Sequence, residues 1–104
     1  MANRHRGEVA TLIGGERRTL CLTLGALADL EDRLGASDVT ALAERLGSGR
    51  LSAKDITAIL AAGLRGGGAT VSEEDVAAMS LDGGALSAAL AVTELLEVTF
   101  GEPA

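Results

Sequence analysis

The chain has almost no aromatic residues, because its 104 residues include one phenylalanine, Phe100, and no tyrosine or tryptophan. Aromatic rings bury more area than other side chains, so the core must be built from leucine, isoleucine, valine and alanine. The 14 glycines have no side chain and therefore bury even less apolar area. We therefore expect one compact domain of modest stability that is further stabilised when it binds a partner.

Cysteine and histidine are equally scarce, with one residue of each, Cys21 and His5. A single cysteine excludes an internal disulfide, and no ligand spacing for a metal site is present. A catalytic serine or cysteine would need His5 to fold back from the chain terminus as its base. The sequence therefore predicts a protein that is not an enzyme and has no cofactor or metal, with Cys21 as a small core residue.

Basic residues and long apolar runs are also few. The chain has 15 acidic and 9 basic residues, a formal net charge of −6, whereas proteins that bind nucleic acid need a basic surface. No run reaches the roughly 18 apolar residues of a membrane span, and the start MANRHRGE lacks the apolar segment of a signal peptide. We expect a cytoplasmic protein that binds neither nucleic acid nor membranes.

Three short patterns resemble functional motifs but have simpler interpretations. The run Gly66–Gly68 follows a helical pattern and lacks the lysine of a phosphate-binding loop, so it reads as an interhelical link. The acidic run Glu73–Asp75 stands where a helix begins, and the helix dipole favours acidic residues there. The run Ser80–Asp82 resembles the serine motif of a carrier domain, but a leading hairpin argues against that fold.

The first ordered element is a predicted β-hairpin over residues 7–23. Two segments of alternating apolar residues flank Gly14-Gly15, which supply the positive φ angles of a type I′ turn. The two-residue turn pairs position 13 with 16, 11 with 18 and 9 with 20, and Arg17 and Arg18 disfavour pairing with other chains. This register puts four apolar residues on one face, which must pack against helices: Val9, Ile13, Leu20 and Leu22.

The remaining segments, over residues 24–100, have the spacing and caps of short helices. Thr23 is the predicted cap of a helix that ends at Gly35, and a second helix spans Asp38–Leu46. Ser52 opens a third, with Asp55 completing a capping box, and Ser72 opens a fourth. The predicted inward residues are Leu24, Leu27, Leu30 and Leu34, then Val39, Leu42 and Leu46, then Ile56, Ile59, Leu60 and Leu64, then Val76 and Met79.

The last predicted helix, about Ala85–Phe100 after a break at Asp82–Gly84, is apolar on more than one side, and its only charged residues are Glu94 and Glu97. A helix of this kind is buried in its own fold or against a partner. We expect four of its residues to bind a partner: Leu86, Leu90, Leu96 and Phe100. The alternative is that they close the core of the chain itself.

These elements define the predicted fold class, which is α+β and mainly helical. An N-terminal β-hairpin packs on a bundle of four to five short helices within a single domain of residues 1–104. Residues 1–6 and 101–104 are expected to form flexible tails.

The segments RGEVATLIGGERRTLCLTLGALADLEDRLG and RLSAKDITAILAAGLRGGG resemble the small tail protein family of gene transfer agents and related siphophages, classed among phage tail assembly chaperones. The resemblance spans roughly Arg6 to Phe100. It implies a non-enzymatic chaperone that coats the tape measure protein, recruits tail tube subunits, and is absent from the finished particle. It provides no catalytic residues. The free hairpin edges further suggest pairing with another copy into a homo-oligomer.

Two other functions are compatible with the sequence. A structural tail component, either a tube or a connector subunit, would have to form rings, and such subunits usually carry more β-structure than one hairpin. A small regulatory module would need a cognate partner that no feature of the sequence identifies.

Overall fold

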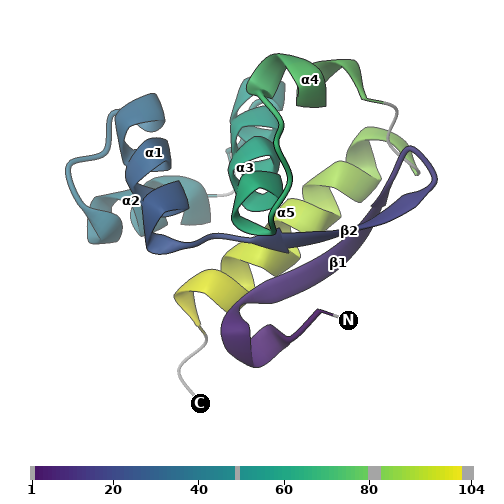
Figure 1. Cartoon of the computed structure of the whole chain (residues 1–104). Helices are drawn as coiled ribbons and strands as arrows, with labels where there is room; N and C mark the ends of the chain where they lie inside the picture. The colour runs from purple at the N-terminus through teal and green to yellow at the C-terminus, as the bar shows by residue number, and fades with distance from the viewer. Residues whose placement is uncertain (1, 49, 80–82, 102–104) are drawn as a thin grey trace.

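The computed structural model describes residues 2–48, 50–79 and 83–101 and has the predicted α+β fold (Figure 1). A two-stranded antiparallel sheet is followed by five α-helices in the described part of the chain. The elements are η1 (Arg4–Arg6), β1 (Glu8–Ile13), β2 (Glu16–Cys21), α1 (Leu24–Leu34), α2 (Val39–Gly47), α3 (Ala53–Gly66), α4 (Glu73–Ala78) and α5 (Gly84–Phe100).

The hairpin has the register that the sequence predicted. Ile13 pairs with Glu16 and Val9 pairs with Leu20, and the turn residues Gly14 and Gly15 have φ angles of +62° and +80°. Positive φ at both positions is the requirement of a type I′ turn, and glycine meets it without strain. The four residues predicted to share the inward face are all buried: Val9, Ile13, Leu20 and Leu22.

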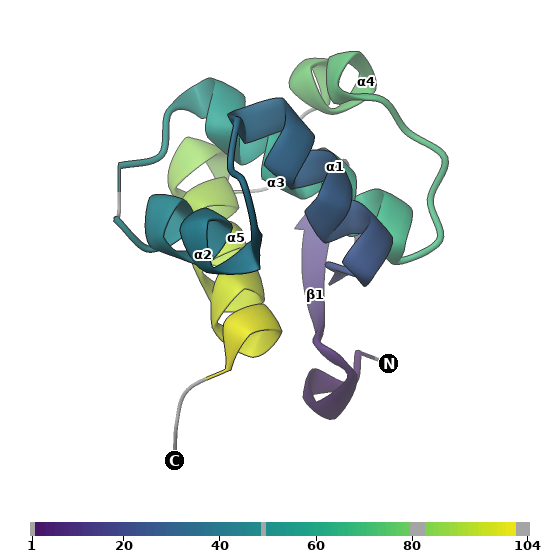
Figure 2. The same cartoon turned by 90° about the vertical axis from the view of Figure 1, so that its left-hand side faces the viewer.

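The helices pack on the inward face and on one edge of this hairpin. Helix α3 lies beside β2, whereas α5 lies behind the sheet and contacts mainly β1 (Figures 1 and 2). Gly63 of α3 sits where Leu20 and Leu95 meet, and a β-carbon there would lie 3.0 Å from the Leu95 side chain. Helix α1 packs on α3, and α2 reaches from α1 to α5. Among the described residues the buried apolar side chains are all aliphatic, as the composition predicted.

The predicted N-caps Thr23, Ser52 and Ser72 are confirmed, and Asp38, where the second helix was expected to begin, is the N-cap of α2. The Thr23 hydroxyl accepts from the Ala26 N–H at 3.0 Å, and the Asp38 carboxylate accepts from the Ala41 N–H at 2.7 Å. Ser52 and Ser72 each form a complete capping box with the aspartate three residues later. Because each cap satisfies N–H groups that a helix start leaves unpaired, these residues fix where the helices begin.

Several expectations about single residues and segments are wrong. Leu24 is 82 % exposed and Val39 is also exposed. Leu24 lies about 90° around α1 from the stripe through Leu27 and Leu30, and Ala26 is buried instead. Cys21 is half-buried on the outer face, with its Sγ 3.7 Å from the Arg6 carbonyl, and is not a core residue.

Part of the expected N-terminal tail is ordered. We expected a flexible tail over residues 1–6, and within it Arg4–Arg6 forms the short helix η1, whose Arg6 N–H donates to the Asn3 carbonyl at 3.0 Å. Residues 102–104, most of the second expected tail, lie outside the described residues, as do Gly49 and the run Ser80–Asp82.

Candidate partner-binding groove

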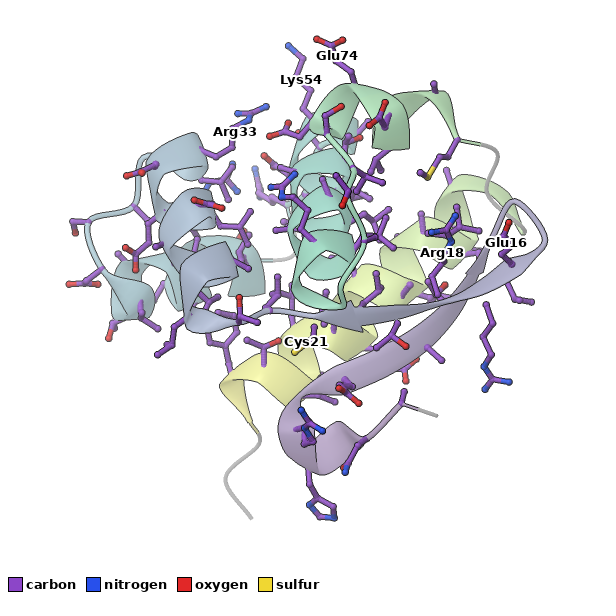
Figure 3. The ribbon with its side chains drawn as sticks, in the orientation of Figure 1. Glu16, Arg18, Cys21, Arg33, Lys54 and Glu74 are labelled. Carbon is purple, nitrogen blue, oxygen red and sulfur yellow. The ribbon has the colours of Figure 1, made fainter. Side chains whose placement is uncertain are left out.

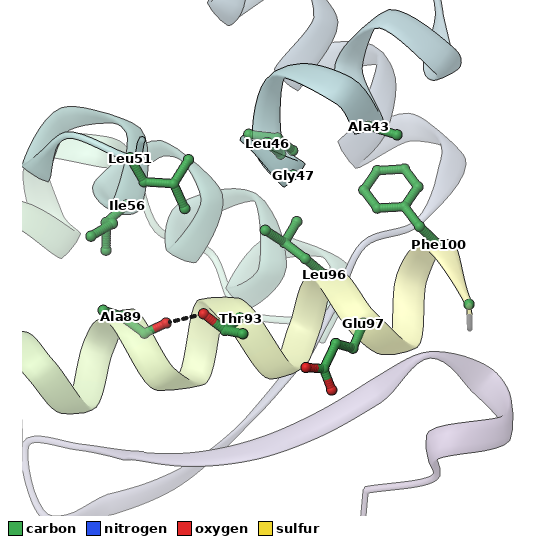
Figure 4. Close-up of a pocket in the computed structure, with 11 residues that line it drawn as sticks. Ala43, Leu46, Gly47, Leu51, Ile56, Ala89, Thr93, Leu96, Glu97 and Phe100 are labelled. Carbon is green, nitrogen blue, oxygen red and sulfur yellow. Dashed lines mark hydrogen bonds between the residues drawn. The ribbon is translucent and has the colours of Figure 1, made fainter. Parts of the chain in front are cut away.

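A groove runs between α5 on one side and α2 with the start of α3 on the other (Figure 4). Its volume is about 430 Å³, and most of its lining is apolar. The α2 and α3 side contributes Ala43, Leu46, Gly47, Leu51 and Ile56; the α5 side contributes Ala89, Thr93, Leu96, Glu97, Phe100 and Gly101. The groove is therefore walled by segments that lie about forty residues apart in the sequence.

An ion pair holds the α2 wall in place against α3. The Arg45 guanidinium lies 3.3 and 3.2 Å from the two carboxylate oxygens of Asp55. One of those oxygens also accepts from the Ser52 N–H at 3.0 Å. This backbone hydrogen bond from Ser52, together with the Arg45 charge, lowers the pKa of Asp55 below its ordinary value, although burial acts in the opposite direction. Asp55 stays ionised at neutral pH and ties α2 to α3.

The α5 wall presents apolar side chains with one carboxylate at the rim. Leu96 and Phe100 are half-buried and point toward α2 (Figure 4). The Thr93 hydroxyl donates to the Ala89 carbonyl at 2.9 Å, so its hydrogen bond is already made within the helix. Glu97 is exposed on the solvent side of the groove. The wall can therefore accept an apolar surface without leaving a buried donor unpaired.

The four residues predicted to bind a partner fall into two pairs. Leu96 and Phe100 line the groove, whereas Leu86 and Leu90 lie outside it and are 72 % and 62 % exposed. The alternative that these residues close the core is wrong for Leu86 and Leu90. The buried face of α5 is formed by other residues: Ala88, Ala91, Val92 and Leu95.

The exposed pair nevertheless continues the line of the groove. Residues spaced by three and four lie on one face of a helix. Leu86, Leu90, Thr93 and Glu97 have that spacing, and all four are exposed. Leu86 and Leu90 therefore extend the α5 wall toward the start of the helix. We call this stripe and the α5 wall together the α5 track, running from Leu86 to Phe100.

The sequence prediction missed the opposite wall. Leu51 and Ile56 lie one residue before and four residues after the Ser52 cap, the two positions of a hydrophobic staple. That spacing was the available signal. Ala43 and Leu46 lie on α2 with no comparable mark, because their proximity to α5 follows only from the tertiary fold.

The residues considered for chemistry have other roles in the structure. Gly66 and Gly67 lie against the carbonyl oxygens of Cys21 and Thr19 and serve packing. Glu73 pairs with Arg33 of α1 at 3.1 Å, on the part of the surface where Figure 3 labels Arg33, Lys54 and Glu74. In the described part of the chain, no group of three or more histidine, cysteine, aspartate or glutamate side chains is arranged to hold a metal ion.

Comparison with known families gives one clear result. A family model described as phage tail tube protein, GTA-gp10, matches residues 6–102. The chain belongs to this family and is thus a tail protein of a phage or gene transfer agent. Comparison with curated proteins and with solved structures gives no match. No helix within the described ranges is both long and apolar enough to cross a membrane.

Proposed function

We propose that this tail protein is a non-enzymatic assembly chaperone that holds an amphipathic helix of the tape measure protein along the α5 track and recruits tail tube subunits to it. The observation that carries the proposal is the α5 track itself, with two exposed leucines that lead into an apolar groove. Membership of a tail protein family supports a role in tails of phages or gene transfer agents.

The dimensions of the track suit a helical ligand. Fourteen helical steps separate Leu86 from Phe100, which corresponds to about 21 Å or four turns. A partner helix lying alongside would place residues at every third or fourth position against the leucines and the phenylalanine, the usual mode of helix-in-groove recognition. Long apolar helices need such cover before they assemble, because exposed apolar patches promote aggregation.

The charges around the groove indicate which charges the partner helix should carry. Glu97 stands at the rim of the groove, and the chain carries a formal net charge of −6. A helix with lysine or arginine beside its apolar stripe is attracted to this rim, and an acidic helix is repelled. The ligand is therefore an amphipathic helix with a basic flank.

A second candidate function is a structural subunit of the tail tube, and the printed description of the family favours it. A tube wall is a ring of subunits with continuous interfaces. The described part of this chain offers a two-stranded sheet as its only β-structure, which favours the chaperone. Mass spectrometry of purified particles separates the two functions, since a tube subunit is present in many copies and a chaperone is absent.

The direct test is co-expression of the chain with tape measure fragments and with the tail tube protein from the same gene cluster. The chaperone function predicts that a tape measure fragment stays soluble and co-purifies. Leu90→Lys should reduce that capture at least about tenfold, because it removes an exposed apolar contact and adds a charge that repels a basic flank.

Leu24→Lys is the matched control for this experiment. Leu24 is an exposed leucine on α1 that does not line the groove, so its replacement should leave capture unchanged. If neither the tape measure fragment nor the tube protein co-purifies with the folded wild-type chain, the chaperone proposal is wrong. Equal loss of capture in both variants would place the binding surface elsewhere.

A further inference from the structure

The two outer edges of the hairpin differ in what covers them. In a hairpin closed by a two-residue turn, the residues flanking the turn exchange hydrogen bonds, and every second pair along the ladder does the same. The observed register therefore turns the N–H and C=O groups of Glu8, Ala10 and Leu12 outward on β1, and those of Arg17, Thr19 and Cys21 outward on β2.

Helix α3 closes the β2 edge. The backbone of Gly66 and Gly67 lies directly against the outward carbonyl oxygens of Cys21 and Thr19, so closely that a β-carbon on either glycine would collide with them. The α-carbon hydrogens of glycine make weak contacts with such oxygens. No additional strand can reach this edge without displacing the end of α3.

The β1 edge is open over two residues. The Glu8 N–H donates to the Asn3 carbonyl at 3.0 Å, whereas the outward groups of Ala10 and Leu12 have no partner among the described residues. Helix α5 packs behind β1, and its Ser87 lies beside Leu12. Leu12 is 54 % exposed, and no charged side chain stands between Val9 and Ile13. Edges of this kind pair readily with another strand.

We propose that β1 pairs antiparallel with β1 of a second copy of this chain, across a two-fold axis at Thr11, to form a four-stranded sheet. Ala10 of each copy then lies opposite Leu12 of the other. Each of these residues offers one outward N–H and one outward C=O, and in this register every one of those groups finds a partner. The two Thr11 side chains meet at the axis, a favourable cross-strand pair.

The charges beside the edge match a second copy. Arg17 is exposed, neighbours Leu12 across the ladder, and has no ion-pair partner among the described residues. In the four-stranded sheet it lies on the same face as Glu8 of the second copy, two strands across and two residues along, or about 12 Å away. Extended arginine and glutamate side chains span that gap, and the two-fold axis creates the contact twice. This attraction opposes the repulsion between two chains of net charge −6.

The inference does not depend on the chaperone function, because it rests on backbone groups of β1 and not on the side chains of the α5 track. Sedimentation equilibrium of the full chain over a wide concentration range tests it. We expect a reversible dimer for the wild type and for Leu90→Lys. We expect Leu12→Lys to raise the dimer dissociation constant at least about tenfold, because it places lysines on both copies near the axis. Circular dichroism checks that each variant is folded.

A monomeric wild type at every concentration overturns the proposal, as does a Leu12→Lys variant that dimerises as well as the wild type. If Leu90→Lys weakens the dimer as much as Leu12→Lys does, the interface lies on the α5 track instead. Hydrogen exchange of the wild type provides an independent measurement. The amides of Ala10 and Leu12 should become protected as concentration rises, and fast exchange at all concentrations contradicts the pairing.

Discussion

The hairpin with α3 and the groove beside α5 are built from the same small set of aliphatic residues, yet they are packed very differently. Helix α3 buries an unbroken run from Ala58 to Leu64, and its glycines let the hairpin approach the helix backbone. Helix α5 buries one narrow face and leaves Leu86 and Leu90 in solvent. Helix α3, packed against the hairpin, therefore contributes more buried apolar side chains than α5 does, whereas α5 leaves more apolar surface exposed.

The largest expected effect comes from breaking the packed region. Gly66→Ala should destabilise the fold by about 3 kcal/mol or more, because its β-carbon collides with the Cys21 carbonyl, a backbone group that cannot turn aside. Urea unfolding measures the change. Gly25→Ala is the control: a β-carbon there meets only the Thr23 hydroxyl at 3.8 Å, so a gain of about 0.5–1 kcal/mol is expected from helix propensity. Equal stability of both variants would show that the close approach is not required.

A smaller effect is expected at the groove wall, where two similar capping boxes provide a matched pair. Asp55→Asn should cost about 1–2 kcal/mol, because it weakens the cap and removes the charge that pairs with Arg45. Asp75→Asn alters the corresponding box of α4, where no described arginine pairs with the carboxylate, and should cost less. Thermal unfolding compares the two variants. A larger loss for Asp75→Asn would contradict the importance of the Arg45 contact.

The same carboxylate gives a pH dependence of defined sign. Because the pKa of Asp55 in the folded chain is lowered from its ordinary value of 3.8, its contribution to stability is fully present above that value. The contribution is lost as the pH falls through the lowered pKa of the folded state. Unfolding measured between pH 6 and pH 2 should therefore show a smaller acid-induced loss of stability in Asp55→Asn than in the wild type, and identical profiles would argue against the lowered pKa.

Much of the fold could be predicted because its signals are local. Gly14-Gly15 fixed the hairpin register, and Thr23, Ser52 and Ser72 marked helix starts that the structure confirms. The sequence could not show the tight approach of Gly66 to β2 or the place of α2 beside α5, because both depend on how separate elements pack. Leu24 was misplaced because a leucine in the first helical turn fits the helical spacing without facing the core.

The candidate site was predictable on one side only. Leu96 and Phe100 stood out on a helix with few charges, and they do line the groove. Ala43 and Leu46 belong to a helix whose pattern also fits ordinary core packing, so only the tertiary structure reveals them as the facing wall. The partner itself leaves no mark in the chain beyond an apolar track with an acidic rim.

The most direct test of the central claim, that the α5 track binds an amphipathic helix of the tape measure protein, is methyl NMR of the folded chain during titration with a tape measure peptide that has a basic flank. The proposal predicts that the methyl signals of Leu86, Leu90 and Leu96 shift in a saturable way, while those of Leu24 stay in place. Shifts confined to Leu24, or no shifts at any of these leucines, would contradict it.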